Sequence, residues 1–311
     1  MAAYHPPRPL LSTPFAGYHL PANFLLPRPS PDAFGKSGAV QVRVALPGER
    51  VTYPIEVGGD PTGVAYGWVR LIDSVAVDST RPLVSDTVQA PSQPGLYRLA
   101  LVEGALRHVL DTLTLVVLVP FEEKRGSLLD GYRIGIFPGE RSPRRSGNWP
   151  AGFVRVYPET AELAVSKHLR LGDFITRDGQ TTWPRYVALS PRLLDKVELV
   201  AARIARTRRD TSQFQLHIDV QSAFRTPFYN RLNRFARESR HQFGDAMDLA
   251  IDADGDGRLT LRDARIVTDA VEAVERDHPD LVGGLGLYTS RKYSHPYVHI
   301  DARGSRVRWR G

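Results

Sequence analysis

Two histidines and one aspartate in the second half of the sequence have the side chains and spacing of a metal site. His241 and Asp248 are seven residues apart with Gly244 between them, and His299 lies further along the chain. Seven residues exceed one helical turn, but a loop that turns at Gly244 into a strand can bring both side chains together. With His299 on a neighbouring strand, they would hold a zinc ion and leave one position open for water, which is typical of catalytic sites. Spacing alone also allows histidines that only make hydrogen bonds.

A second group of oxygen ligands follows in residues 252–263. This segment has carboxylates at positions 1, 3, 5 and 12, a glycine at position 6 and a backbone carbonyl at position 7, which is the spacing of a calcium loop. The apolar Leu259 stands at position 8. The pattern predicts a single structural calcium site, and the alternative is an acidic turn that binds no ion. The predicted ligands are Asp252, Asp254, Asp256, the carbonyl of Arg258, and Asp263.

The composition is that of a globular protein long enough for two domains. The chain has 311 residues, of which 42% are hydrophobic and 24% are charged, and it contains no cysteine. The lack of cysteine excludes disulfides, thiolate zinc sites and a cysteine nucleophile, so His, Asp or Glu must hold any metal. The longest apolar run, residues 113–120, is far shorter than a membrane span needs, so we expect none.

The sequence divides into three parts. Residues 1–34 contain eight prolines and no secretory signal pattern, so we expect a poorly ordered leader. Residues 35–125 carry short alternating runs separated by Gly, Pro and Asp clusters, which predicts a small all-β, immunoglobulin-like sandwich. The predicted strands are 40–44, 51–57, 66–70, 96–102 and 113–119.

Residues 126–311 predict an α+β domain. Apolar residues recur at helical spacing in 193–204 and 261–274, and apolar strands are expected at 214–220, 247–251 and 297–301. The calcium loop at 252–263 is then an insertion between a strand and a helix.

Positive charge is concentrated in one segment. The net charge is +7, and residues 201–240 hold nine arginines against three acidic residues. Such an Arg-rich face can attract an anionic cell-wall polymer, lipid headgroups or nucleic acid, or it can be an ordinary solvated surface. We do not expect nucleic acid, because the aromatic residues among these arginines are equally well explained as core or pocket walls. They are Phe224, Phe228, Tyr229 and Phe235.

Four motifs in the second half resemble, in the same order, those of the zinc D-Ala-D-Ala carboxypeptidase family. That family includes murein endopeptidases and the Hedgehog signalling domain. The similarity covers residues 130–311, is strongest from Ser222 onward and does not reach the β-rich half. The segments are Ser222–Asn230, similar to S-G-Y-R-T-P-x-x-N; Ser239–Asp248, which fits S-x-H-x-x-G-x-A-x-D; Gly283–Tyr288, similar to G-G-x-G-x-Y; and Val298–Asp301, similar to V-H-x-D.

The resemblance implies a Hedgehog-type zinc peptidase fold and hydrolysis of peptide bonds in peptidoglycan stem peptides or cross-links. It implies a periplasmic or extracellular location. It also implies roles for single residues: His241, Asp248 and His299 as zinc ligands, Arg225 facing the scissile carbonyl, and Ser222 and Ser239 in substrate binding. The alternative for both serines is turn capping.

One position departs from the family pattern. Many relatives have an acidic general base three residues before the last histidine ligand, where this chain has Pro296. The candidates for proton transfer are His295 and Asp301, although Asp301 could instead orient a histidine ligand. Because the acid is missing, a second hypothesis stays open, in which a non-catalytic, zinc-stabilised module binds the cell wall or a glycan.

Overall fold

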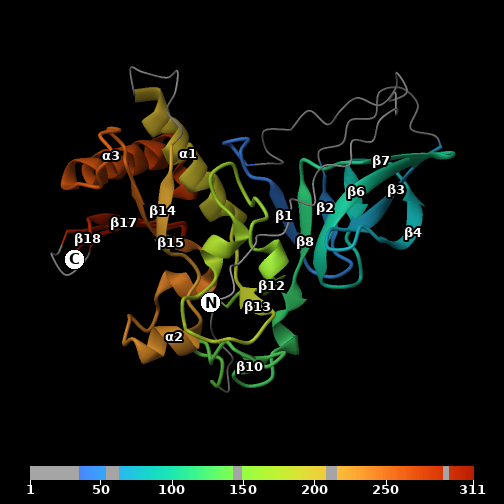
Figure 1. The fold of residues 1–311 in the computed structure, drawn as a ribbon, viewed down its shortest axis with the longest axis horizontal. Helices are drawn as coiled ribbons and strands as arrows, with labels where there is room; N and C mark the ends of the chain where they lie inside the picture. The colour runs from blue at the N-terminus through green and yellow to red at the C-terminus, as the bar shows by residue number, and fades with distance from the viewer. Residues whose placement is uncertain (1–34, 54–62, 143–148, 208–215, 290–293) are drawn as a thin grey trace, which may run out of the picture.

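The computed structural model describes residues 35–53, 63–142, 149–207, 216–289 and 294–311. The fold is mixed α/β and consists mostly of strands in several sheets. Figure 1 shows a strand-rich N-terminal part beside a C-terminal part that carries the long helices. The leader predicted at residues 1–34 lies outside the described residues. Among the described helices, none combines the length and the apolar character that a bilayer span requires.

The N-terminal part is built on one six-stranded sheet and one two-stranded sheet. The large sheet has the order β1-β8-β6-β3-β4, with β7 paired to β6, and the small sheet joins β2 and β5. Tyr53, Trp68 and Val88 belong to the hydrophobic cluster between the two sheets. The likeness of this part to an immunoglobulin domain stays a prediction. The strands are β1 Val42–Ala45, β2 Arg50–Thr52, β3 Val64–Arg70, β4 Ala76–Pro82, β5 Thr87–Gln89, β6 Gly95–Glu103, β7 Leu106–Val109 and β8 Thr114–Val117.

A middle region of small sheets and 3-10 turns joins the two parts. Val42 and Val116 of the first sheet belong to the same buried cluster as Phe153 and Leu193. Part of the 35–125 region therefore packs into the core of the 126–311 region, although the N-terminal sheets also have a separate cluster of their own. The elements are β9 Val119–Pro120, η1 Phe121–Glu123, β10 Leu128–Leu129, β11 Tyr132–Arg133, β12 Gly152–Val156, η2 Pro158–Thr160, η3 Leu171–Phe174 and β13 Arg185–Val187.

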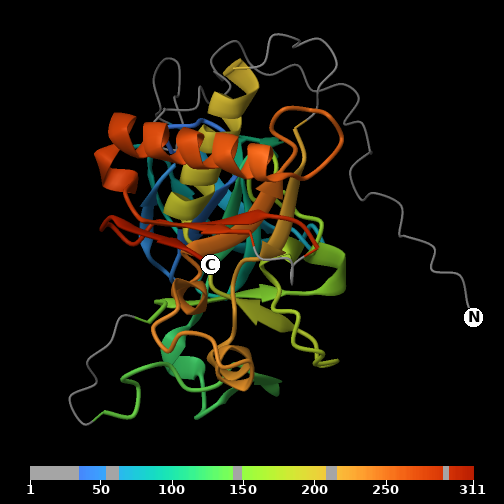
Figure 2. The same ribbon diagram turned by 90° about the vertical axis from the view of Figure 1, so that its left-hand side faces the viewer.

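The C-terminal part is a five-stranded sheet in the order β14-β15-β17-β16-β18, with the two long helices on one side (Figure 2). The helices α1 and α3 correspond to the two helices that the apolar spacing predicts. The strand predicted at 214–220 is described only from residue 216. The elements are α1 Pro191–Thr207, β14 Ile218–Ser222, α2 Pro227–Leu232, η4 Arg240–Phe243, β15 Ala246–Ile251, α3 Leu261–Asp277, η5 Pro279–Leu281, β16 Gly284–Tyr288, β17 Tyr297–Asp301 and β18 Val307–Arg310.

The alternation of side chains along the strands separates the core from the polar face of this sheet. Leu249 and Val298 belong to the core cluster that also contains the apolar faces of α1 and α3. Their chain neighbours Asp248 and His299 point to the opposite face, because successive strand residues alternate. The helices therefore anchor one face of the sheet and leave the other face for polar side chains.

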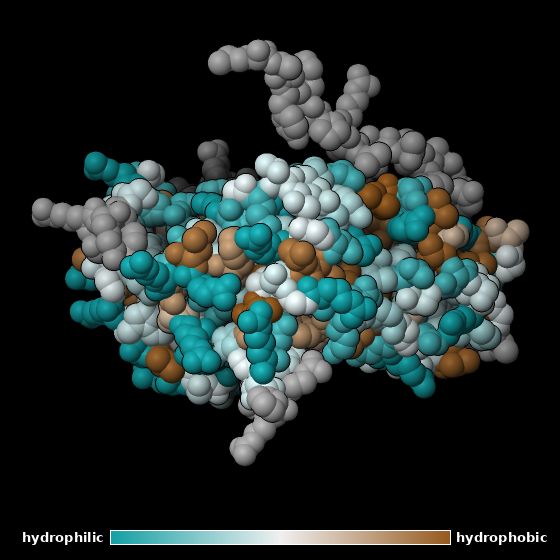
Figure 3. All heavy atoms as spheres, turned by 90° about the horizontal axis from the view of Figure 1, so that it is seen from below, coloured by the Kyte–Doolittle hydropathy of each residue, from teal (hydrophilic) through white to brown (hydrophobic). Residues whose placement is uncertain are grey.

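The surface at the α2 end of the molecule is mainly hydrophilic. Figure 3 looks onto this end, which lies at the bottom of Figure 1, and shows hydrophobic residues exposed only between polar ones. No apolar docking surface dominates this view.

A buried ion pair ties both helices to the sheet. The Lys196 ammonium of α1 donates to the Glu275 carboxylate of α3 at 2.7 Å and to the Asp301 carbonyl of β17 at 2.6 Å. Both side chains are almost fully buried, with exposed fractions of 0% and 4%. Burial lowers the pKa of Lys196, and the Glu275 carboxylate opposes that shift. The second Glu275 oxygen accepts from Arg308 of β18.

Replacing Lys196 with Met is expected to destabilise the fold by about 1–3 kcal/mol, because Glu275 and the Asp301 carbonyl would lose a buried donor while Arg308 still pairs with Glu275. Urea unfolding followed by circular dichroism measures the change. Lys167→Met, at an exposed position, is the control. A loss below about 1 kcal/mol for the Lys196 variant, the range of surface pairs, would contradict a structural role for the pair.

Candidate metal centre

The register of the sheet and one glycine turn bring three side chains to one point. Asp248 of β15 lies directly opposite His299 of β17, so both side chains extend from the same face. His241 comes from η4, which ends at Gly244 with a φ of 71°. A Cβ at Gly244 would lie 2.4 Å from the Ala188 carbonyl carbon. The left-handed turn and the close approach therefore both require glycine.

The three converging atoms have the spacing of metal ligands. His241 Nε2 lies 3.2 Å from Asp248 Oδ1 and 3.1 Å from His299 Nδ1. His299 Nδ1 lies 2.8 Å from Asp248 Oδ1. Two ligands in a tetrahedral zinc site with bonds of about 2.0–2.1 Å are about 3.3 Å apart. All three residues are buried, so the geometry fits a small cation with a restricted path to solvent.

The outer hydrogen bonds of the two imidazoles fix which nitrogens face inward. His241 Nδ1 lies 2.6 Å from the Ala223 carbonyl, which can only accept, so this nitrogen carries the proton. His299 Nε2 lies 3.2 Å from an Asp301 carboxylate oxygen and donates to it in the same way. In their neutral forms both rings then turn a lone pair toward the Asp248 carboxylate. Three acceptors without a donor among them can be satisfied by a metal cation, or by a proton on one of the two rings.

The surroundings shift the pKa values of the three candidate ligands in different directions. Burial lowers the pKa of His241, which favours the neutral ring. Burial alone would raise the pKa of Asp248, but the neighbouring His241 and His299 outweigh it and hold the pKa well below the usual range. Burial would likewise lower the pKa of His299, but its hydrogen bonds to Asp248 and Asp301 raise it. The Asp248 carboxylate is therefore ionised at neutral pH.

Arg225 lies beside this centre. Its Nη2 donates to Asp248 Oδ2, the oxygen that does not face the histidines, and its Nε donates to Ser222 Oγ at 2.8 Å. Its guanidinium carbon stands 4.5 Å from the centre of the Phe235 ring. Ser222, expected in substrate binding, therefore fixes the guanidinium. Arg225 Nη1 has no hydrogen bond with a described residue.

Asp301 supports His299 from behind. It is fully buried, accepts from the Gly284 N–H at 2.7 Å, and pairs with Arg303. Burial alone would raise its pKa, but the hydrogen bonds from His299, Arg303 and Gly284 hold the pKa far below the usual range. A Cβ at Gly284 would lie 2.2 Å from an Asp301 oxygen. The paired glycines 283–284 thus leave room for this carboxylate, which is placed to orient the histidine rather than to face the open side.

Among the described contacts, His295 and Ser239 make no direct contact with the three converging side chains. His295 Nε2 lies 3.2 Å from Asp219 Oδ2, and its Nδ1 lies 3.1 Å from the Pro296 carbonyl. It makes no hydrogen bond or ion pair with the three metal-ligand candidates among the described contacts. Ser239 precedes η4, and its carbonyl accepts from the Gln242 N–H at 3.2 Å.

The structure adds an aromatic wall that the motifs did not reveal. The Trp309 ring of β18 lies 4.9 Å from the His299 ring, and its N–H donates to the Tyr288 hydroxyl at 2.9 Å. A Cβ at Gly286 would lie 2.4 Å from the Trp309 ring, so this glycine lets the indole lie across β16. Tyr288 stacks on Tyr297 with ring centres 4.6 Å apart. The sequence signal for this residue is the alternation along 307–310, which places Trp309 on the polar face of the sheet.

The acidic loop after β15 gathers three of its predicted calcium ligands. Ligand oxygens of Asp252, Asp254 and Asp256 all lie within 4.8 Å of one another and could hold an ion. The predicted loop carbonyl belongs to Arg258, whose N–H donates to Asp256 Oδ1 at 2.8 Å. The calcium site itself stays a prediction.

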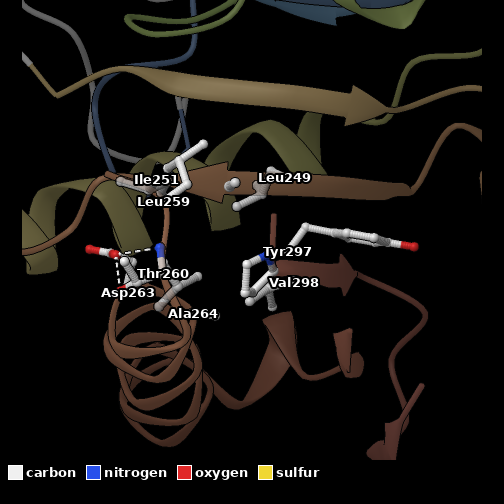
Figure 4. Close-up of a pocket in the computed structure, with 11 residues that line it drawn as sticks. Leu249, Ile251, Leu259, Thr260, Asp263, Ala264, Tyr297 and Val298 are labelled. Carbon is white, nitrogen blue, oxygen red and sulfur yellow. Dashed lines mark hydrogen bonds between the residues drawn. The ribbon is translucent and has the colours of Figure 1, made fainter. Parts of the chain in front are cut away.

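Asp263 does not join this group. Its Oδ1 accepts from the Ala253 and Asp254 N–H groups, and its Oδ2 accepts from Thr260 at 2.8 Å. It therefore forms a capping box at the start of α3 instead of the expected last calcium ligand. Figure 4 shows the hydrogen bonds between Thr260 and Asp263 and places Leu259 against Ile251 of β15. The loop is thus fixed at its end by capping and by an apolar contact.

Comparison with known proteins assigns no family to this chain. No model of a known protein family matches it, and the search of curated proteins finds no match either. The interpretation of the centre therefore depends on the motifs and on the geometry described above.

Changing Asp301 to Asn is expected to weaken zinc binding by about 10–100-fold, because the amide orients His299 less strongly and leaves the ring less basic. Competition with a zinc chelator of known affinity measures the change. Asp269→Asn, at an exposed position on α3, is the control. Equal zinc affinity in both variants would contradict the supporting role of Asp301.

Calcium is expected to raise the melting temperature of the wild-type protein by several degrees, since a ligand at about 100 times its Kd stabilises the native state by about 2.7 kcal/mol. Asp254→Asn should abolish most of this increase, because it removes one of the three converging carboxylates. Differential scanning calorimetry with calcium or with a chelator measures it, and Asp269→Asn again serves as the control. If calcium does not change the melting temperature of the wild-type protein, the loop is an acidic turn that binds no ion.

Proposed function

We propose that this chain is a zinc-dependent hydrolase of peptide bonds in peptidoglycan stem peptides or their cross-links. The observation that carries the proposal is the convergence of His241 Nε2, Asp248 Oδ1 and His299 Nδ1, with both outer ring nitrogens already committed to acceptors. Three protein ligands are typical of catalytic zinc sites, which keep a fourth position for water or substrate. Zinc bound there supplies a Lewis acid that polarises a carbonyl and acidifies water.

Arg225 is the residue best placed to stabilise developing negative charge. Ser222, Asp248 and the Phe235 ring hold its guanidinium in place, and Nη1 is left to donate toward a substrate carbonyl oxygen. A donor that is already fixed costs no reorganisation when the tetrahedral transition state forms. The planar, permanently charged guanidinium suits this role.

The peptidoglycan substrate is inferred from the resemblance of the four motifs. The aromatic wall of Trp309, Tyr288 and Tyr297 gives one side of the centre an apolar surface with polar tips, on which a peptide backbone can pack. A periplasmic or extracellular location belongs to the same proposal, because the substrate lies outside the cytoplasm.

Proton transfer to the leaving amine falls to His295 in this proposal. Asp301 lies behind His299, whereas His295 is half-buried just before the start of β17 and pairs with Asp219. A positioned imidazole is the commonest general acid or base in enzymes. His295 would replace the acidic residue that many members of the resembled family have at the position of Pro296.

A second function is favoured by one observation, the proline at position 296. A zinc centre without an acidic base suits a non-catalytic module in which the metal stabilises a wall-binding fold. Such a module would retain peptidoglycan without releasing products, whereas the hydrolase would release products that mass spectrometry resolves.

Incubation of the purified, zinc-loaded protein with defined muropeptides is expected to yield peptide products that disappear with a chelator and return with added zinc. Arg225→Gln should lower kcat by about 10²–10³-fold, the usual cost of losing one oxyanion donor. Arg265→Gln on α3 is the control, and metal content is measured for every variant. Bound muropeptide without any product would overturn the hydrolase and favour the binding module.

A further inference from the structure

A basic groove lies on the α2 side of the candidate metal centre. It has a volume of about 610 Å³ and opens between α2 and residues 136–142. Four arginines line it, and none of its described lining residues is acidic. The arginines are Arg141, Arg231, Arg234 and Arg237.

These guanidinium groups are not neutralised by the protein. Arg141, Arg231 and Arg234 form no ion pair with any described carboxylate, and Arg237 has only an exposed contact of 3.7 Å with Glu238. An exposed pair of that kind contributes little. The acid nearest in sequence to Arg141 is Glu140, which turns away to Lys124 at 2.5 Å and to the Phe137 N–H at 2.8 Å. The groove therefore keeps an excess of positive charge.

Only part of the Arg-rich segment contributes to this charge. Arg203 pairs with Asp277, and Arg240 pairs with Asp245. The end of α1 and the helix α2 lie at opposite ends of the C-terminal part in Figure 1. The expected Arg-rich face is thus divided, and the arginines of α2 and the turn after it form the groove.

The groove is connected to the metal centre through one aromatic ring. After α2 the chain turns at Arg234, whose φ is 55°, and Phe235 packs back against Tyr229. Phe235 lines the groove and stacks under Arg225, which in turn donates to Asp248. Phe235 and Arg225 therefore separate the groove from the three converging side chains, and a ligand that extends past Phe235 would approach them.

The arginines of the groove match the carboxylates of a peptide. A guanidinium group binds a carboxylate through two parallel hydrogen bonds, which adds geometric specificity to the attraction between the charges. A peptide with carboxylates close together could therefore bind more than one of the four arginines.

We propose that this groove binds the carboxylate-bearing part of an acidic peptide, so that acidic residues on one side of the scissile amide determine substrate choice. This inference rests on the proposed peptidase function and specifies the substrate for the same centre. The arginines act in binding and position the chain, while the metal centre and Arg225 act on the amide.

The cleavage test compares a muropeptide that has free carboxylates with the same muropeptide after amidation. Wild-type protein should prefer the acidic form by at least about tenfold in kcat/KM, since charge-assisted hydrogen bonds to two guanidinium groups are lost on amidation. The double variant Arg231→Gln, Arg234→Gln should bring this ratio close to one, mainly through a higher KM for the acidic form. The control, Arg265→Gln with Arg276→Gln, removes the same charge from exposed positions on α3 and should keep the ratio.

A binding test separates this inference from the proposed function. Fluorescence anisotropy of a labelled acidic muropeptide, with protein kept in chelator, should show at least about tenfold weaker binding for the groove variant than for the control. Arginine-dependent binding without cleavage in any protein would support the groove and overturn the peptidase. If the groove variant and the control cleave with the same preference for the acidic muropeptide and bind it equally well, the groove proposal is overturned and the peptidase is supported.

The same assay tests the rival ligand. A glycerol-phosphate polymer should compete weakly with the acidic muropeptide for the wild-type protein. Tight, arginine-dependent binding of that polymer, with no binding of the muropeptide, would overturn the proposal and assign the groove to a wall polymer.

Discussion

The centre of this molecule depends on three acceptor atoms held about 3 Å apart with no donor among them. His241 and His299 each give their only ring proton to an outer acceptor, and Asp248 carries a charge that its neighbours stabilise. Such an arrangement is costly in a buried site unless a cation occupies it, because each unpaired acceptor loses its interaction with water. The rest of the C-terminal part can be understood as the framework that keeps these atoms together against that cost.

The framework works through the two faces of one sheet. One face is packed by α1 and α3, and the buried Lys196 ammonium joins both helices to β17 by donating to the carbonyl of Asp301. The side chain of that same residue orients His299 on the other face. Asp301 therefore contributes to both: its carbonyl holds the helical layer, and its side chain orients a ligand of the candidate metal centre. Glycines at 244, 284 and 286 let backbone, carboxylate and indole approach where any side chain would collide.

The two sides of the centre differ in chemistry. The β18 side offers the stacked rings of Tyr288 and Tyr297 with the Trp309 indole hydrogen-bonded to Tyr288. The α2 side offers arginines around a groove whose described lining residues include no acid. An extended peptide placed across the centre would meet an apolar wall at one end and positive charge at the other. Under the proposed function, this difference would give a peptide substrate one direction across the centre.

The sequence by itself determined the types and the order of the three candidate ligands and the main elements around them, because these depend on short-range spacing. The examples are the turn at Gly244, the side-chain alternation around Asp248 in β15, and the helical repeat of α1 and α3. Tertiary structure alone decided which distant residues meet. Trp309 reaches His299 only because β18 pairs in parallel with β16, Asp263 caps α3 because its oxygens meet the base of the loop, and the arginines of one segment divide between two ends of the fold. These contacts follow from how the sheet and helices pack, and local spacing does not encode that packing.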